Sequence, residues 1–121
     1  MGGKWENKRI GRIGEDIAGR FLVEKGYEIV KRNWGSKWGE IDIVAKTNGI
    51  YIFVEVKTKM GESFGSPEEM VNRKKLMQVE RIASTFPSIE KFQKRIDVVA
   101  VVLNEDLSVK RINHYECVYS L

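Results

Sequence analysis

Residues 39–59 read GEIDIVAKTNGIYIFVEVKTK, and this stretch decides the fold. Two runs rich in Ile and Val flank the dipeptide Asn48-Gly49, the strongest short signal for a two-residue hairpin turn. The pattern predicts antiparallel strands at about 40–47 and 50–59. Because side chains alternate between the two faces of a strand, the turn also determines which residues lie opposite each other.

The predicted register places two carboxylates opposite each other. Asp42 faces Glu55 at a non-hydrogen-bonded position, where the Cβ atoms lie about 4.5–5.5 Å apart. Like charges in such a pair destabilise a sheet, so we expect a positive group nearby. Lys57 lies on the same strand face as Glu55 and supplies part of that charge. A divalent cation between the carboxylates would supply more, and magnesium prefers oxygen ligands.

An ordinary surface ladder of ion pairs is the alternative explanation for these charges. The two carboxylates would then pair with Lys57 and Lys59 on a solvated face. Tyr51 and Phe53 argue against this, because they predict that the charged face is covered near the turn. The charges therefore belong to the open end of a partly buried face, as in a cleft.

The rest of the chain predicts an α/β protein, a mixed sheet flanked by helices. Apolar residues recur at helical spacing before the hairpin, and Ser66, Pro67 and Glu69 mark the start of a later helix. The predicted elements outside the hairpin are a helix over 8–25, a strand over 27–33, a loop over 32–39, a helix over 66–86, and strands over 95–103 and 109–116.

Length and composition predict one cytoplasmic domain over residues 1–121. The single Cys117 excludes an internal disulfide framework and fits a reduced compartment. We expect neither a secretory signal nor a membrane span, because no apolar run is long enough. The formal net charge of +4 is compatible with a polyanionic partner.

Glu15, on the first predicted helix, is a further candidate site residue. It lies beside the apolar stripe of that helix, and Gly11 and Gly14 would permit a close approach to the sheet. Glu15 then points toward the charged hairpin face. Pairing with Arg12 or Arg20 at an exposed helix edge is the equal alternative.

Four sequence blocks resemble a known family. GEDIAGRFLVEKGYEIVKRN, GEIDIVA, FVEVKT and RIDVVAV are similar to the YraN-like family of uncharacterised bacterial proteins, from about Gly14 to Val101. A helix Glu, a strand Asp and Glu-x-Lys on the next strand also resemble the PD-(D/E)xK nuclease superfamily, with its Holliday-junction-resolvase-like members. Ile41 stands where that motif has proline, which leaves the candidate ligands in place.

The resemblance implies a restriction-endonuclease-like core of helix, three strands, helix and strand. It implies hydrolysis of DNA phosphodiester bonds with Mg²⁺ or Mn²⁺, including those of branched or damaged DNA. By position, Asp42, Glu55 and the carbonyl of Val56 become metal ligands, and Glu15 becomes an auxiliary ligand. Lys57 becomes the residue that orients the attacking water or neutralises charge.

Further basic and aromatic residues have two interpretations each. Trp34 and Trp38 either stack on unpaired bases or cap the core, and the core is favoured. We expect His114 to be a surface strand residue and Cys117 to be a small apolar filler. The candidates for phosphate contacts are Lys57, Lys59, Arg73, Lys74 and Lys75. A solvated helix face is the alternative for Arg73, Lys74 and Lys75.

The residues leave a second function open. A non-catalytic module on the same fold would bind nucleic acid or a protein partner through its basic face. The trio of Asp42, Glu55 and Lys57 favours the nuclease, because a binding module does not need opposed carboxylates. RNA in place of DNA and a homodimer also stay open.

Overall fold

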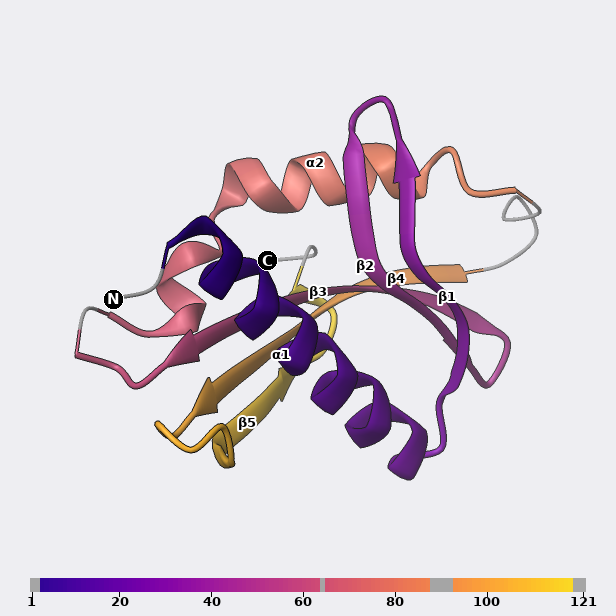
Figure 1. The fold of residues 1–121 in the computed structure, drawn as a ribbon. Coiled ribbons are helices and arrows are strands. Elements are labelled where there is room, and N and C mark those ends of the chain that lie inside the picture. The colour runs from indigo at the N-terminus through magenta and orange to yellow at the C-terminus, as the bar shows by residue number, and fades with distance from the viewer. Residues whose placement is uncertain (1–2, 64, 88–92, 119–121) are drawn as a thin grey trace.

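The structure is a computed structural model that describes residues 3–63, 65–87 and 93–118. In these ranges two α-helices cover a five-stranded sheet, which confirms the α/β class and the predicted order of elements (Figure 1). The elements are α1 (Lys4–Glu24), β1 (Glu28–Ser36), β2 (Gly39–Thr47), β3 (Ile50–Met60), the 3₁₀ helix η1 (Pro67–Met70), α2 (Arg73–Ala83), β4 (Gln93–Leu103) and β5 (Val109–Tyr115).

The sheet is mixed, as predicted. Its strand order is β1-β2-β3-β4-β5, and β3 pairs with β4 in parallel while the other neighbours are antiparallel. The predicted β2–β3 register is confirmed from the turn as far as Ile43 and Val54. Asn48 and Gly49 have φ values of 49° and 76°, the left-handed conformations that this hairpin turn requires.

The sheet opens beyond that last pair. The pairing of β2 with β3 ends at Ile43 and Val54, whereas β2 continues against β1 as far as Gly39 and β3 continues against β4 as far as Met60. Figure 1 shows the paired ends of β1 and β2 rising away from the other strands. Asp42 and Glu55 therefore lie where the two strands begin to separate.

Two apolar clusters hold the helices on opposite faces of the sheet. Leu22 of α1 belongs to the cluster that contains Val54, and Ile82 of α2 belongs to the one that contains Phe53. Since Phe53 and Val54 are neighbours in one strand, their side chains point to opposite faces. Neither helix in the described ranges has the length and apolar composition to cross a membrane.

The single helix predicted over 66–86 is wrong, because two separate caps begin two elements. The backbone N–H of Ser66 donates to the carboxylate of Glu69 at 3.0 Å, but this cap begins only the short η1. The chain then becomes extended at Val71, and the side chain of Asn72 accepts the N–H of Lys75 at 2.9 Å to begin α2.

The loop predicted over 32–39 is also mostly strand. β1 runs to Ser36, so Trp34 lies within it and only a tight turn separates it from β2. The rings of Trp34 and Phe86 meet edge-to-face with centroids 5.1 Å apart, and Trp38 packs against the same cluster. Both tryptophans thus cap the core, which is the interpretation that the sequence favoured over base stacking.

α1 approaches β3 closely at Gly14. A Cβ atom at this position would lie 1.8 Å from Oγ1 of Thr58, whereas one at Gly11 would meet open space. The predicted close approach of the helix to the sheet is therefore confirmed at Gly14, whereas Gly11 makes no such contact.

Gly14→Ala is expected to lower the free energy of unfolding by about 1–3 kcal/mol, because the added methyl group must displace the stiff Thr58 side chain or the helix. Gly11→Ala is the matched control, and better helix propensity should make it neutral or more stable by about 1 kcal/mol. Urea denaturation of both variants measures the difference. Equal effects would contradict the close packing of α1 on β3.

Candidate functional site

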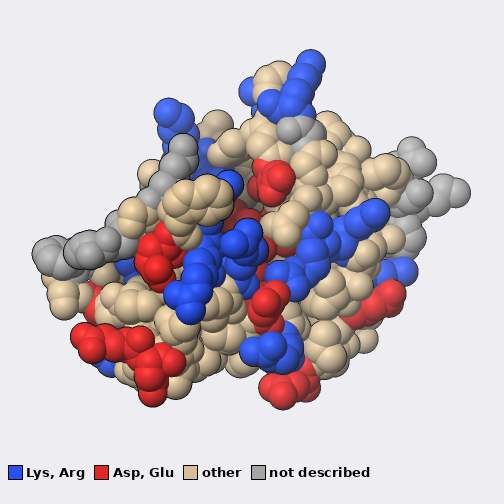
Figure 2. Space-filling model, viewed as in Figure 1, with Lys and Arg blue, Asp and Glu red and all other residues tan. Residues whose placement is uncertain are grey.

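A recess with a volume of about 700 Å³ opens where β2 leaves β3. Its walls come from the first half of α1, the second half of β3 and the start of α2. Figure 2 shows acidic side chains deep in a hollow of this face, with Lys and Arg side chains around them. The predicted site residues that line the recess are Glu15, Asp42, Glu55, Val56, Lys57, Lys59 and Lys75. Arg73 and Lys74 are exposed and are not among its lining residues.

The carboxylate of Asp42 replaces the missing strand neighbour of Val56. The backbone N–H of Val56 donates to Oδ2 of Asp42 at 2.8 Å. Within a strand, the N–H and C=O of one residue point to the same side. The carbonyl of Val56 therefore also faces the gap that β2 leaves.

Burial raises the pKa of both central carboxyl groups. The pKa of Asp42 is raised to about 7, first by burial and next by the charge of Glu55. Burial also raises the pKa of Glu55, while Lys75 and Lys57 act in the opposite direction. Nζ of Lys75 lies 3.7 Å from Oε2 of Glu55, and Glu55 is only 3% exposed. Two neighbouring carboxyl groups with raised pKa values in one recess mark a candidate functional site.

Glu15 reaches the recess from α1 and is held there by β1. Nδ2 of Asn33 donates to Oε1 of Glu15 at 3.0 Å, and the guanidinium of Arg32 lies 3.7 Å from the same oxygen. Of the two interpretations, the one that points Glu15 toward the hairpin is confirmed. Sequence reasoning did not predict that Arg32 and Asn33 contact Glu15, because it placed both residues where a strand gives way to a loop.

The donor set suits a small, hard cation. No group of three or more His, Cys, Asp or Glu side chains in the described ranges is arranged to hold a metal ion. Magnesium, however, is commonly held by one or two carboxylates and keeps several waters. Asp42, Glu55 and the Val56 carbonyl are such a set, so the residues fit Mg²⁺ or Mn²⁺.

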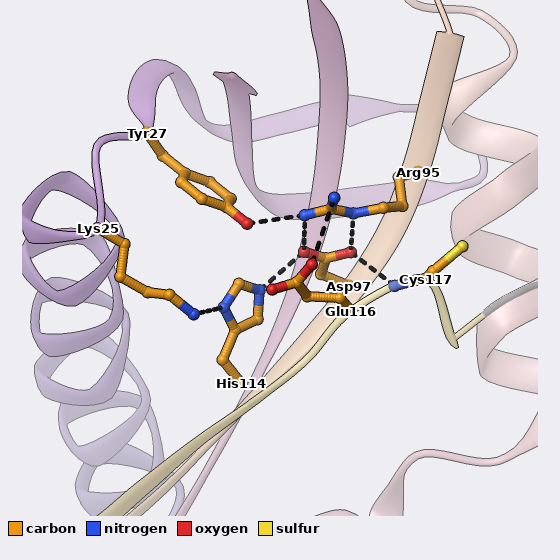
Figure 3. Close-up of polar contacts among 7 residues, drawn as sticks. All are labelled: Lys25, Tyr27, Arg95, Asp97, His114, Glu116 and Cys117. Carbon is orange, nitrogen blue, oxygen red and sulfur yellow. Dashed lines mark hydrogen bonds and ion pairs between the residues drawn. The ribbon is translucent and has the colours of Figure 1, made fainter. Parts of the chain in front are cut away.

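A second polar cluster surrounds Asp97, whose own side chain is fully buried (Figure 3). The guanidinium of Arg95 donates two hydrogen bonds of 2.8 Å to the carboxylate of Asp97. Nε2 of His114 lies 2.7 Å from Oδ2 of the same carboxylate. The side chain of His114 is 2% exposed, so its predicted surface position is wrong. The prediction of Cys117 as a core filler is wrong too, because this residue is exposed and its N–H donates to Asp97 at 3.0 Å.

The fold and the recess define a class: an α/β protein with one buried carboxyl group, one half-buried carboxyl group and two lysines at the opening of a mixed sheet. The profile of the uncharacterised protein family UPF0102 matches residues 14–101, and the chain belongs to this family. This confirms the YraN-like resemblance. Residues 14–101 include five side chains that line the recess: Glu15, Asp42, Glu55, Lys57 and Lys75.

Curated relatives carry the same family description. A UPF0102 protein of Caldicellulosiruptor bescii is 41% identical over 110 residues, which cover 88% of this chain and 92% of the relative. One from Alkaliphilus oremlandii is 41% identical over 115 residues, 91% of this chain and 97% of the relative. One from Caldanaerobacter subterraneus is 37% identical over 115 residues, 92% of this chain and 94% of the relative.

Proposed function

We propose that this protein is a cytoplasmic, metal-dependent DNA endonuclease of the PD-(D/E)xK type. The observation that carries the proposal is the meeting of Asp42 and Glu55 with Lys57 and Lys75 in one recess. The order of elements, with β3 and β4 parallel and the hairpin strands parting at Asp42, supports a restriction-endonuclease-like core.

Asp42, Glu55 and the carbonyl of Val56 would hold Mg²⁺ or Mn²⁺, with Glu15 in reach through a water. When bound, the metal would polarise the phosphate and lower the pKa of the attacking water. Asn33 and Arg32 keep Glu15 oriented toward the recess. The chain thus contributes a preorganised set of oxygens, which needs little rearrangement at the moment of reaction.

The two lysines lie on different elements, and both would neutralise negative charge of the phosphate. Lys57 follows Glu55 by two residues on β3, so it is placed to orient the attacking water or to neutralise charge on the phosphoryl oxygens. Lys75 neutralises Glu55 from α2, and a cation on Glu55 would free its ammonium group for the phosphate. Lys59, Arg73 and Lys74 would bind the DNA backbone outside the centre.

The direct test is incubation of purified protein with duplex, flap, single-stranded and four-way-junction DNA in Mg²⁺ or Mn²⁺. Cleavage or nicking of at least one of them, and none in chelator, is the expected result. Binding that falls steeply with salt but is never followed by cleavage would favour the non-catalytic module instead. Neither binding nor cleavage would favour a protein partner.

Metal affinity is expected to rise with pH, because the cation competes with the proton of Asp42. Calorimetric titration with Mn²⁺ on either side of the pKa of about 7 should show tighter binding at the higher pH. Asp42→Asn should weaken binding by about 10–100-fold and flatten this dependence. Glu40→Gln, on the same strand but outside the recess, is the control. Equal affinity of wild type and Asp42→Asn would make the carboxylates merely structural.

The raised pKa of Asp42 also makes the stability of the metal-free protein fall as the pH rises, whereas metal affinity increases. A carboxyl group whose pKa rises from 3.8 to about 7 on folding contributes stability that is fully present below 3.8. This contribution is lost as the pH rises through about 7. Asp42→Asn should therefore gain stability relative to wild type at alkaline pH, as measured by thermal melts in chelator. A constant difference across this pH range would contradict the raised pKa.

A further inference from the structure

Trp5 is the most exposed large apolar side chain of the described residues, with 82% of its surface open to solvent. It lies in the first turns of α1. Lys8, Arg9 and Arg12 follow at the spacings that put residues on one helix face, and all three are exposed. Tryptophan and arginine are the residue types that contribute most often to binding hot spots, so their presence together on one exposed helix face favours a binding surface.

This basic and aromatic face of α1 lies next to the recess. The opposite side of the same turns carries Glu6, Asn7 and Ile10, which line the recess. α1 therefore separates its basic and aromatic face from the recess by the width of one helix, which is about 10–12 Å. In Figure 2, Lys and Arg side chains spread over the face on which α1 lies in front.

We propose that this face of α1 binds unpaired DNA that leaves the recess. The indole of Trp5 stacks on one exposed base, and Lys8, Arg9 and Arg12 contact the phosphates beside it. The inference rests on the proposed nuclease function and narrows its substrate to DNA with unpaired bases, such as a flap or a single-stranded branch.

Charge and geometry together favour this occupant. The basic side chains complement a polyanion, and among the described residues the ion pair of Arg9 is an exposed one with Glu6 at 3.1 Å. A base inside a duplex offers no free face to an indole, whereas an unpaired base does. Trp34 and Trp38 are packed into the core cluster around Phe86, so Trp5 is the tryptophan placed to stack.

Binding measured without cleavage tests the inference. Fluorescence anisotropy in chelator should compare labelled single-stranded, flap and duplex DNA of the same sequence. Trp5→Ala should weaken binding of the single strand and the flap by about tenfold and leave duplex binding little changed. Trp5→Phe, which keeps an aromatic face, should restore most of the affinity. Val23→Ala, on the same helix face five turns away and 55% exposed, should have no effect.

The outcomes separate this inference from the proposed function. Loss of binding in Trp5→Ala supports the inference, even if no DNA is cut and the nuclease proposal fails. Unchanged single-strand binding in Trp5→Ala overturns it, even if the protein cuts DNA. Equal loss on duplex and single strand, or no DNA binding by the wild type, also overturns it.

Discussion

Glu55→Gln is expected to abolish metal-dependent cleavage of DNA, with a loss of rate on the order of 10³-fold, or about 4 kcal/mol of transition-state stabilisation. The substitution keeps the shape of the side chain but removes the charge that would bind the cation. It also removes the partner of Lys75, whose ammonium group lies 3.7 Å away. Both the metal and the position of the lysine are affected, so the effect on rate exceeds that of losing one ion pair.

A plasmid-nicking assay measures this loss, with anisotropy and circular dichroism to show that the variant still binds DNA and is folded. Lys57→Ala and Lys75→Ala should strongly reduce the rate. Lys57→Met should keep more of the DNA affinity than of the activity, because other basic residues also bind. Met77→Ala is the matched control on α2, since this residue is 55% exposed and lies outside the recess. A Glu55→Gln enzyme that cuts at the wild-type rate would refute the proposed site.

Asp97→Asn is expected to lower the free energy of unfolding by about 3 kcal/mol, because it leaves the half-buried guanidinium of Arg95 without its nearest counter-ion. The Asp97 carboxylate is fully buried and accepts hydrogen bonds from Arg95, His114 and the Cys117 backbone. Nζ of Lys25 lies 2.7 Å from Nδ1 of His114, and an ammonium group can only donate. Nε2 of His114 therefore carries the proton that Asp97 accepts, and an amide in place of the carboxylate would misplace these donors.

Chemical denaturation of the metal-free protein measures this effect, with Asp16→Asn as the exposed control. Burial acts to raise the pKa of Asp97, but the hydrogen bonds from His114 and Arg95 outweigh it and hold the pKa below 3.8. The resulting stability is present above 3.8 and is lost as the pH falls through the lower, folded-state pKa. Asp97→Asn should lack this acid dependence. A decrease of less than about 1 kcal/mol in the free energy of unfolding of Asp97→Asn would show that the cluster contributes little to stability.

Local patterns in the sequence were sufficient for the hairpin and for the candidate ligands. Asn48-Gly49 sets a turn with positive φ angles, and the alternation of side chains then places Asp42 and Glu55 on one face. Gly14 is likewise predictable as a point of close approach. These features depend on residues close together in the chain, so their physical cause is visible in a short segment.

Local patterns failed where two signals compete over a few residues. Ser66 and Asn72 are both helix caps, and the backbone between them decides that the first begins only one 3₁₀ turn. His114 alternates with exposed residues in its strand, yet its ring is buried because Asp97 and Lys25 surround it. Partners distant in the sequence override such a pattern.

The sequence by itself determined the two hairpin strands, their register from the turn to Ile43 and Val54, and the presence of a carboxylate next to each of these two residues. Only the tertiary structure decided that β2 parts from β3 at Asp42, because β2 follows β1 while β3 follows β4. Only it brought Lys75 of α2 to Glu55, and Asn33 of β1 to Glu15. The physical reason is that register depends on neighbouring residues, whereas a recess depends on the twist of strands and the packing of helices, which join residues far apart in the chain.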